Sequence, residues 1–275
     1  MNGFILKRYK VYIILFTMLT FVFIWQMAQG ENMALVVSQK ISEQIWQNEK
    51  AIELNLVNIL QGRTKGDYLD AKQQISEITL LNLNLHNWST DPSLNCITVF
   101  GDVYPTEGDE LVVALSLGKD KGILAIYEKT LSGYKLISAN TNLIPITNLS
   151  LVQLKGMPYK SLVVDEFLDE MLGAFYKVKL RSIYAFKGNL LAKLWSSEIY
   201  REEYFPEGFE MKGEKTQWLL KKEETKIAFL PSGDLQVSTK TSWGRGKVLG
   251  KLGSEYIITS TKEVNKIYVW DRKTL

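Results

Sequence analysis

Hydrophobic and polar residues follow a helical period in the part of this chain that begins near residue 31. From Asn32 to Arg63, apolar residues recur four and seven positions apart, which places them on one face of an α-helix. Neither Gly nor Pro occurs between Glu31 and Gln61, and Gly62 is a typical residue at a helix end. The pattern predicts a long amphipathic helix with apolar positions Val37, Ile41, Ile45, Ile52, Leu56 and Leu60.

An apolar stripe of this length is unstable in water unless another surface covers it. The downstream domain could cover the stripe. A second copy of the helix is the alternative, and it would make residues 31–63 the contact of a homo-oligomer. Residues 67–78, which read DYLDAKQQISEI, predict a shorter second helix. We therefore expect residues 31–80 to form a helical region.

Near residue 81 the period changes from about 3.6 to 2. Residues 81–86 read LNLNLH, and this strict alternation predicts a half-buried strand with His86 on the face opposite the leucines. Short strand-like runs separated by turn residues then continue, so we expect residues 81–275 to form an antiparallel all-β domain. The runs cover residues 97–100, 111–117, 122–128, 134–138, 149–154, 161–164, 176–186, 190–195, 217–221, 225–230, 235–239, 255–260 and 266–270.

The amino-terminal residues predict attachment to a membrane. Residues 11–30 carry no charge, and Lys7, Arg8 and Lys10 precede them. About 20 helical residues span a bilayer core of roughly 30 Å, and cations before such a helix favour a cytoplasmic amino terminus. We expect residues 1–10 to form a cytoplasmic basic tail, residues 11–30 a single-pass signal-anchor, and the rest to lie outside the cytoplasm. Cleavage at the small-residue triplet of residues 28–30 would instead give a secreted protein.

The charge balance argues against a nucleic-acid partner. The formal net charge of +3 equals the contribution of the three amino-terminal cations, so the remainder lacks the basic surplus that phosphate binding requires. Cys96 is the only cysteine and His86 the only histidine, which excludes a zinc site built from several such ligands. Cys96 lies in an apolar run and is expected to be buried. The glycine-rich residues 243–252 lack the spacing of a phosphate loop, and no cofactor is expected.

Residues 101–115 read GDVYPTEGDELVVAL, an acidic turn followed by a strand-like run. The segment resembles the FG-GAP repeat of integrin-type β-propellers, in which such a turn precedes a strand of the form acid-Leu-Val-Val. Residues 159–167 (YKSLVVDEF) and 265–275 (NKIYVWDRKTL) are fainter copies. The resemblance implies antiparallel, blade-like sheets in a small or incomplete β-propeller. Because the region is short for a full propeller, a β-sandwich-like stack is the alternative.

In that family the acidic turn often binds calcium between carboxylates. Here Asp102, Glu107 and Asp109 are the weak candidate ligands, and residues 104–106 (YPT) stand where further carboxylates would be wanted. Three carboxylates leave calcium short of its usual six to eight oxygens. We therefore expect a plain turn that leads into a buried strand, and no metal site.

Two further clusters could contribute to a site. The acidic run at residues 165–170 could form an acid and base pair, or it could be a polar turn. The aromatic residues near position 200 could stack on sugar rings or anchor a protein partner, or they could cover a β core. The candidate binding residues from both clusters are Trp195, Tyr200, Tyr204, Phe205, Asp165, Glu166, Asp169 and Glu170.

These features favour a membrane-anchored extracytoplasmic domain that binds a protein or glycan partner, because the sequence contains no recognisable catalytic set. The alternative is a carboxylate-dependent hydrolase of the cell envelope that uses the acidic run at residues 165–170. Carboxylates that converge across an open cleft would favour the hydrolase. Carboxylates that are dispersed would favour the binding domain.

Overall fold

The computed structural model describes residues 50–171, 175–207, 217–231, 234–246 and 256–269. Residues 50–275 form one compact unit, and this unit is described here by itself. The expected basic tail at 1–10, the membrane segment at 11–30 and the greater part of the long helix lie outside the described residues. Among the residues that the structure describes, no helix is both long enough and apolar enough to cross a membrane.

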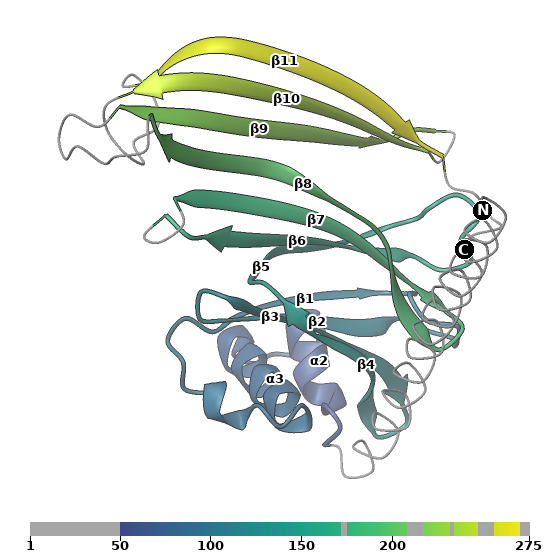
Figure 1. Ribbon diagram of the computed structural model, residues 1–275. Coiled ribbons are helices and arrows are strands. Elements are labelled where there is room, and N and C mark those ends of the chain that lie inside the picture. Colours follow the sequence, from purple (N-terminus) through teal and green to yellow (C-terminus); the bar gives the residue numbers. More distant parts are fainter. Residues whose placement is uncertain (1–49, 172–174, 208–216, 232–233, 247–255, 270–275) are drawn as a thin grey trace, which may run out of the picture. The chain divides into compact units, whose positions relative to one another are not determined.

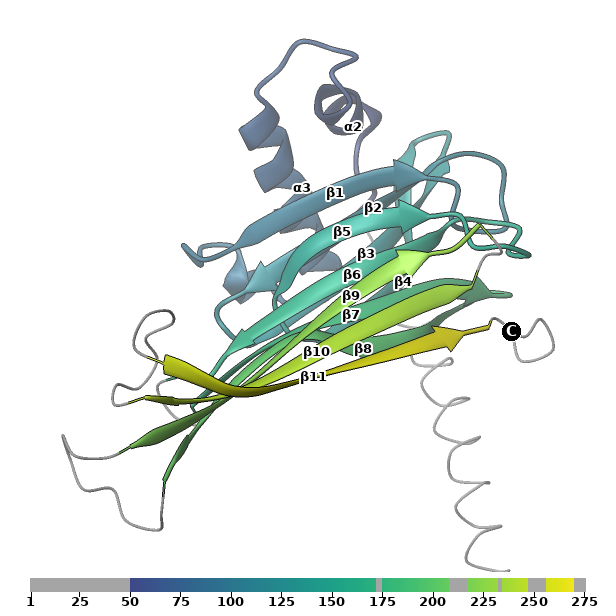
Figure 2. The same ribbon diagram turned by 90° about the horizontal axis from the view of Figure 1, so that it is seen from above.

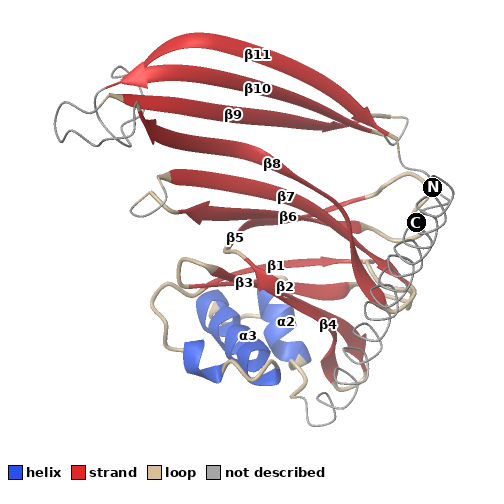
Figure 3. Ribbon diagram, in the orientation of Figure 1, coloured by secondary structure: helices blue, strands red, loops and turns tan. Residues whose placement is uncertain are grey.

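Within the described residues, two α-helices precede the strands (Figure 3). Helix α2 covers Leu54–Leu60 and α3 covers Tyr68–Asn82, where the side chain of Asp67 accepts hydrogen bonds from the first backbone N–H groups. The shorter helix predicted at residues 67–78 is confirmed. The long helix is not continuous as predicted, because Ile52 pairs as an isolated β-bridge with Tyr134 before α2 begins.

The strand predicted at residues 81–86 is wrong. Helix α3 continues to Asn82, and a single 3-10 turn, η2, covers His86–Trp88. Leucine is a good helix former and lacks the branched β-carbon that favours strands, so the well-capped helix continues into the first of these residues and ends at Asn82. His86 therefore begins a short turn after the helix and does not lie on a sheet face.

The described residues form eleven strands in two antiparallel sheets, in which hydrogen-bonded neighbours are also neighbours in sequence. The first sheet has the order β1-β2-β3-β4, and the second has the order β11-β10-β9-β8-β7-β6-β5. Neither sheet closes on itself. The strands are β1 (Asn95–Gly101), β2 (Glu110–Leu117), β3 (Lys121–Thr130), β4 (Gly133–Leu143), β5 (Ile146–Val152), β6 (Ser161–Asp169), β7 (Tyr176–Lys187), β8 (Leu190–Pro206), β9 (Trp218–Phe229), β10 (Leu235–Gly246) and β11 (Tyr256–Tyr268).

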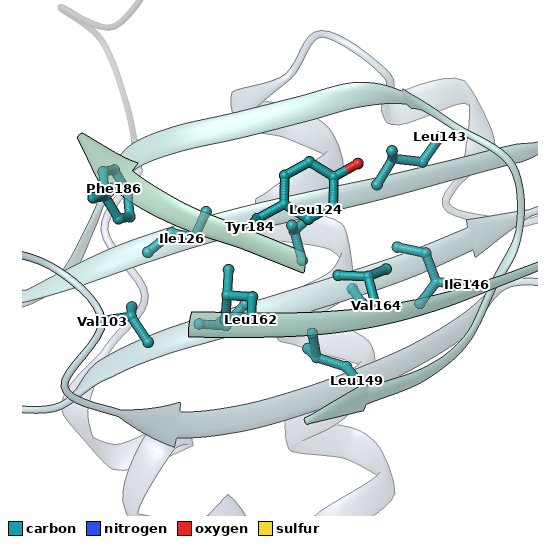
Figure 4. Packing of buried hydrophobic residues seen from close by; sticks show 12 residues of the cluster. Val103, Leu124, Ile126, Leu143, Ile146, Leu149, Leu162, Val164, Tyr184 and Phe186 are labelled. Atoms are coloured by element: carbon teal, nitrogen blue, oxygen red, sulfur yellow. The ribbon is translucent and has the colours of Figure 1, made fainter. Parts of the chain in front are cut away.

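The central strands of the four-stranded sheet, β2 and β3, are buried on both faces over most of their length. One face packs against β5, β6 and β7, and side chains from the two sheets point toward one another (Figure 4). Helix α3 contacts β1 and β2 on the other face, where the Tyr127 hydroxyl donates a 2.9 Å hydrogen bond to Thr79 Oγ1 (Figure 1). The residues between the sheets include Val112, Ala114, Leu124, Ile126, Leu162, Val164, Tyr184 and Phe186.

The far end of the seven-stranded sheet is much less covered. Strands β10 and β11 pair along almost their whole length, with one irregularity after Trp243 (Figure 2). Tyr256 is the only buried residue of β11, although several apolar side chains lie along this strand. The exposed large hydrophobic residues of β11 are Ile257, Ile258, Val264, Ile267 and Tyr268.

The expectation of a mainly β domain with antiparallel sheets is confirmed. Cys96 is buried, as predicted, and this burial raises the pKa of its thiol. The predicted runs at 217–221 and 225–230 belong to one strand, β9, and those at 255–260 and 266–270 fall mostly within β11.

Candidate functional site

The outer face of the seven-stranded sheet carries a row of charged and aromatic side chains. Leu162 and Val164 of β6 point toward the four-stranded sheet, so the alternate residues Asp165, Phe167 and Asp169 continue the opposite, outer face. In the antiparallel register, these three residues pair with three cations of β7. The pairs are Asp165 with Arg181, Phe167 with Lys179, and Asp169 with Lys177.

Two of these cross-strand pairs are ion pairs. The guanidinium of Arg181 donates two hydrogen bonds to Asp165, at 2.6 and 2.7 Å. These bonds raise the pKa of Arg181. The ammonium of Lys177 lies 3.1 Å from Asp169 Oδ2. Asp165 and Asp169 are thus each neutralised by the β7 cation directly opposite.

The third pair leaves a cation without a carboxylate. The Lys179 ammonium lies 5.5 Å from the centre of the Phe167 ring, a distance typical of a cation–π contact. Among the described residues, Lys179 forms no ion pair. Its side chain is exposed, so the charge stands at the surface between the two neutralised pairs.

Phe167 and the three β7 cations of these pairs form one wall of an open pocket of about 550 Å³. Strands β6, β7, β8 and β9 all contribute to it. Its charged lining residues are all basic, and the remaining lining is aromatic, aliphatic or hydroxylic. The lining residues are Phe167, Lys177, Lys179, Arg181, Ile199, Tyr200, Thr225, Lys226 and Ile227.

A β-bulge brings two consecutive residues of β8 to the pocket. Lys179 pairs with Tyr200, but the next residue of β7, Leu180, pairs with Glu198, so Ile199 is the extra residue. In a regular strand Ile199 and Tyr200 would point to opposite faces. The bulge therefore explains why both residues line the pocket.

A buried carboxylate holds the tyrosine of this pocket in place. Glu202 is 0% exposed and accepts hydrogen bonds from the hydroxyls of Tyr200 and Tyr204. Burial, followed by these hydrogen bonds, raises the pKa of both tyrosines. The two hydroxyls therefore stay protonated at neutral pH and act as donors to Glu202.

The other predicted aromatic residues do not join the pocket. Trp195 packs in a cluster with Val163 and Ile183. The centre of its ring lies 6.1 Å from the centre of the Tyr268 ring. Tyr204 is buried in a second cluster with Trp218 and Leu220. Phe205 is 41% exposed and is not part of the pocket lining. Of the four predicted aromatics, only Tyr200 lines the pocket.

The acidic run is divided between the two faces of the sheet. Asp165, Glu166 and Asp169 belong to β6, so the interpretation as a polar turn is wrong for them. Glu166 alternates with Asp165 and accepts hydrogen bonds from Ile144 N–H and the Ser182 hydroxyl. Burial raises the pKa of Glu166. Glu170 follows the strand and pairs through its backbone with Tyr176 and Phe175. The four carboxylates do not converge on one cleft.

The acidic turn before β2 is held by a residue that is not one of the three candidate calcium ligands. Glu110 is buried and accepts hydrogen bonds from the backbone N–H groups of Val103 and Tyr104, at 2.7 and 3.0 Å. Glu107 and Asp109 are exposed, and Asp102 is half-buried. Within the described part of the chain, no group of three or more His, Cys, Asp or Glu side chains could hold a metal ion.

The basic residues of the pocket were not predicted from the sequence. Lys177, Lys179 and Arg181 alternate with apolar residues, which would have placed them on one face of a strand. Their relation to Asp165 and Asp169 depends on the β6–β7 register, which spacing within one strand does not specify.

Comparisons of the chain with known protein families, with curated proteins and with solved structures found no match.

Proposed function

We propose that this chain is a binding domain that recognises a protein or glycan partner through the pocket on the outer face of the seven-stranded sheet. The observation that carries the proposal is the pocket itself, an open space of about 550 Å³ with basic, aromatic and aliphatic walls. Small-molecule sites commonly have volumes of about 300–1,000 Å³ and combine apolar walls with a few polar groups.

The contacts around the pocket favour binding because they fix its side chains before any ligand arrives. Arg181 is held by two hydrogen bonds to Asp165, and Tyr200 is held by Glu202. Side chains that are already ordered lose less conformational entropy on binding. The walls also belong to hydrogen-bonded strands, which position a site more rigidly than loops do.

A carboxylate-dependent hydrolase remains the alternative, but the arrangement of the acidic run favours it less. Asp165 and Asp169 are each engaged with a cation, and Glu166 lies on the opposite face of β6. A general acid and base would have to face the same substrate. These residues offer no such pair in the described structure.

We also propose that residues 11–30 anchor the domain in the cell membrane and that residues 31–275 lie outside the cytoplasm. The apolar segment and the three cations before it support this proposal. Contact between copies through residues 31–63 likewise remains a proposal. The FG-GAP resemblance remains a hypothesis as well. Its best-matching residues, 101–115, cover the last residue of β1, the turn after it and most of β2.

Filling the pocket tests the proposed function. The variant Thr225→Phe places a ring among the lining residues, whereas Ser132→Phe adds a ring at the exposed turn between β3 and β4. The full chain, purified in detergent, is applied to arrays of glycans and of peptides. We expect the wild type and Ser132→Phe to bind the same array members, and Thr225→Phe to lose at least about 90% of that signal.

Equal binding by Thr225→Phe and the wild type, with equal melting temperatures, would show that the pocket is not the site. Binding that both variants lose would point to a general effect of the added ring.

A further inference from the structure

The charged residues around the pocket differ in sign and in whether they already have a partner. The charged residues that line it are Lys177, Lys179, Arg181 and Lys226, and none is acidic. The nearby carboxylates are already engaged. Asp165 and Asp169 neutralise Arg181 and Lys177, Glu224 lies 2.8 Å from Lys222, and Glu202 accepts two tyrosine hydroxyls. Within the described residues, Lys179 and Lys226 form no ion pair.

Lys179 is the better placed of these two lysines. Its side chain lies on the same face as Arg181 and Lys177, directly across from Phe167 and beside Tyr200. The aromatic ring beneath the ammonium limits its hydration on one side. A cation that is partly desolvated and lacks a counter-ion attracts an anion more strongly than a fully hydrated one.

We infer that the pocket binds an acidic sugar, a carboxylate or phosphate group carried on a ring of monosaccharide size, with Lys179 as the main contact to the anion. This inference rests on the proposed function, because it names the ligand class of the same pocket. The carboxylate and the phosphate are treated as one ligand chemistry, since both accept hydrogen bonds from an ammonium.

The walls of the pocket favour a compact acidic ligand over an acidic peptide. Phe167, Ile199, Tyr200 and Ile227 supply apolar surface around the cations, which suits the C–H groups of a sugar ring. An extended acidic peptide would carry several charges along its length and would need a longer series of unpaired cations. The ion pairs on either side of Lys179 leave a single free charge on that row.

Calorimetric titration of the full chain with small probes tests the inference. The probes are glucuronate, glucose 6-phosphate, glucose, inorganic phosphate and a tri-glutamate peptide. We expect glucuronate and glucose 6-phosphate to bind at least about tenfold more tightly than glucose, as expected for one charge-assisted hydrogen bond. We expect inorganic phosphate and the peptide to bind more weakly than either acidic sugar, and added salt to weaken binding of the acidic sugars only.

Two substitutions should shift the affinity in opposite directions. Lys179→Ala removes the free cation and should lower the affinity for glucuronate about tenfold, whereas Lys179→Arg should preserve it. Asp169→Asn releases Lys177 from its ion pair and should raise the affinity about twofold to threefold. Lys135→Ala removes one exposed cation from β4 and should change nothing, which controls for net charge.

Each result decides between the two proposals. If glucose binds as tightly as glucuronate and Thr225→Phe abolishes both, the pocket is the site but the anion preference is wrong. If the peptide binds more tightly than the acidic sugars, the ligand class is wrong. If no probe binds and Thr225→Phe binds the same array members as strongly as the wild type, both proposals are wrong. If no probe binds but Thr225→Phe loses the array signal, the pocket is the site and the ligand class is wrong. Loss of glucuronate binding in Lys135→Ala would show that the effect is only one of net charge.

Discussion

Three buried carboxylates accept hydrogen bonds that hold local parts of the fold in place. Glu110 accepts hydrogen bonds from Val103 and Tyr104 and closes the turn before β2. Glu166 of β6 accepts one from Ile144 N–H, in the connection between the two sheets. Glu202 holds the hydroxyls of two tyrosines. Each group loses hydration on burial and recovers part of that loss through these hydrogen bonds.

Glu166 should make the stability of the fold depend on pH. Because burial raises its pKa, the folded protein binds the proton more tightly than the unfolded chain does. Its contribution is therefore fully present below the ordinary glutamate pKa of 4.5 and is lost as the pH rises through the folded value. Glu166→Gln removes this titration and should flatten the decrease in unfolding free energy between about pH 4.5 and neutrality.

Urea unfolding at several pH values measures this effect. Glu107→Gln, at an exposed position of the turn before β2, is the control and should keep the pH dependence of the wild type. An unchanged slope in Glu166→Gln would mean that Glu166 has the same pKa in the folded and unfolded states.

At the scale of secondary-structure elements, the accuracy of the predicted bounds depended on whether the element is buried. Strand β2 was predicted within one residue of its bounds because both of its faces are apolar. Strand β11 was predicted as two short runs, because Lys262 and Glu263 interrupt its apolar residues. The strand continues through these charges since its side chains are exposed and need not be apolar.

At the candidate site, one pocket residue could be predicted from the sequence, whereas the others depend on strand pairing. Tyr200 could be nominated from the local density of aromatic residues. The ion pairs of Lys177 and Arg181 depend on how β6 and β7 are aligned, and the contribution of Ile199 depends on a bulge in β8. Both features arise from pairing between strands, which the spacing along one strand does not determine.

Helix α3 should contribute to stability through one face only. Ile75 is 0% exposed on the side that packs against the four-stranded sheet, whereas Leu69 of the same helix is 73% exposed. Ile75→Ala should lower the unfolding free energy by about 2–5 kcal/mol, because it removes buried apolar groups and leaves a cavity. Leu69→Ala should change it by less than about 0.5 kcal/mol.

Chemical denaturation of both variants beside the wild type provides the measurement. Equal, small effects of the two substitutions would show that α3 does not stabilise the sheet.

At the scale of the whole described unit, burial decreases along the chain from the first sheet to the last strands. Strand β2 is buried at every residue, and β3 is buried over most of its length. Strand β11 is exposed at every residue except Tyr256. The buried interior between the two sheets is built by residues that precede β8. Strands β9 and β10 contribute to two smaller clusters, with Leu220 and Leu235 among their buried residues, whereas β11 contributes Tyr256 alone to a buried cluster.

This difference predicts the order of amide hydrogen exchange. Amides of β2 and β3 should exchange only when the whole unit unfolds, and amides of β11 should exchange fastest among the strands, because local opening there exposes little apolar surface. Exchange followed by mass spectrometry of peptic fragments resolves these strands. Protection of β11 equal to that of β2 would show that another surface covers β11 in solution.

The sequential order of strands in both sheets also has a consequence for how the protein is made. A chain leaves the ribosome amino terminus first, and each described strand after β1 finds a neighbour that has already emerged, except at the step from β4 to β5, where a new sheet starts. Once β4 is out, the first sheet and both described helices are complete. Contacts between sequence neighbours form quickly because they close short loops. Growth of this fold can therefore keep pace with synthesis, with each new strand added to the edge left open by the one before.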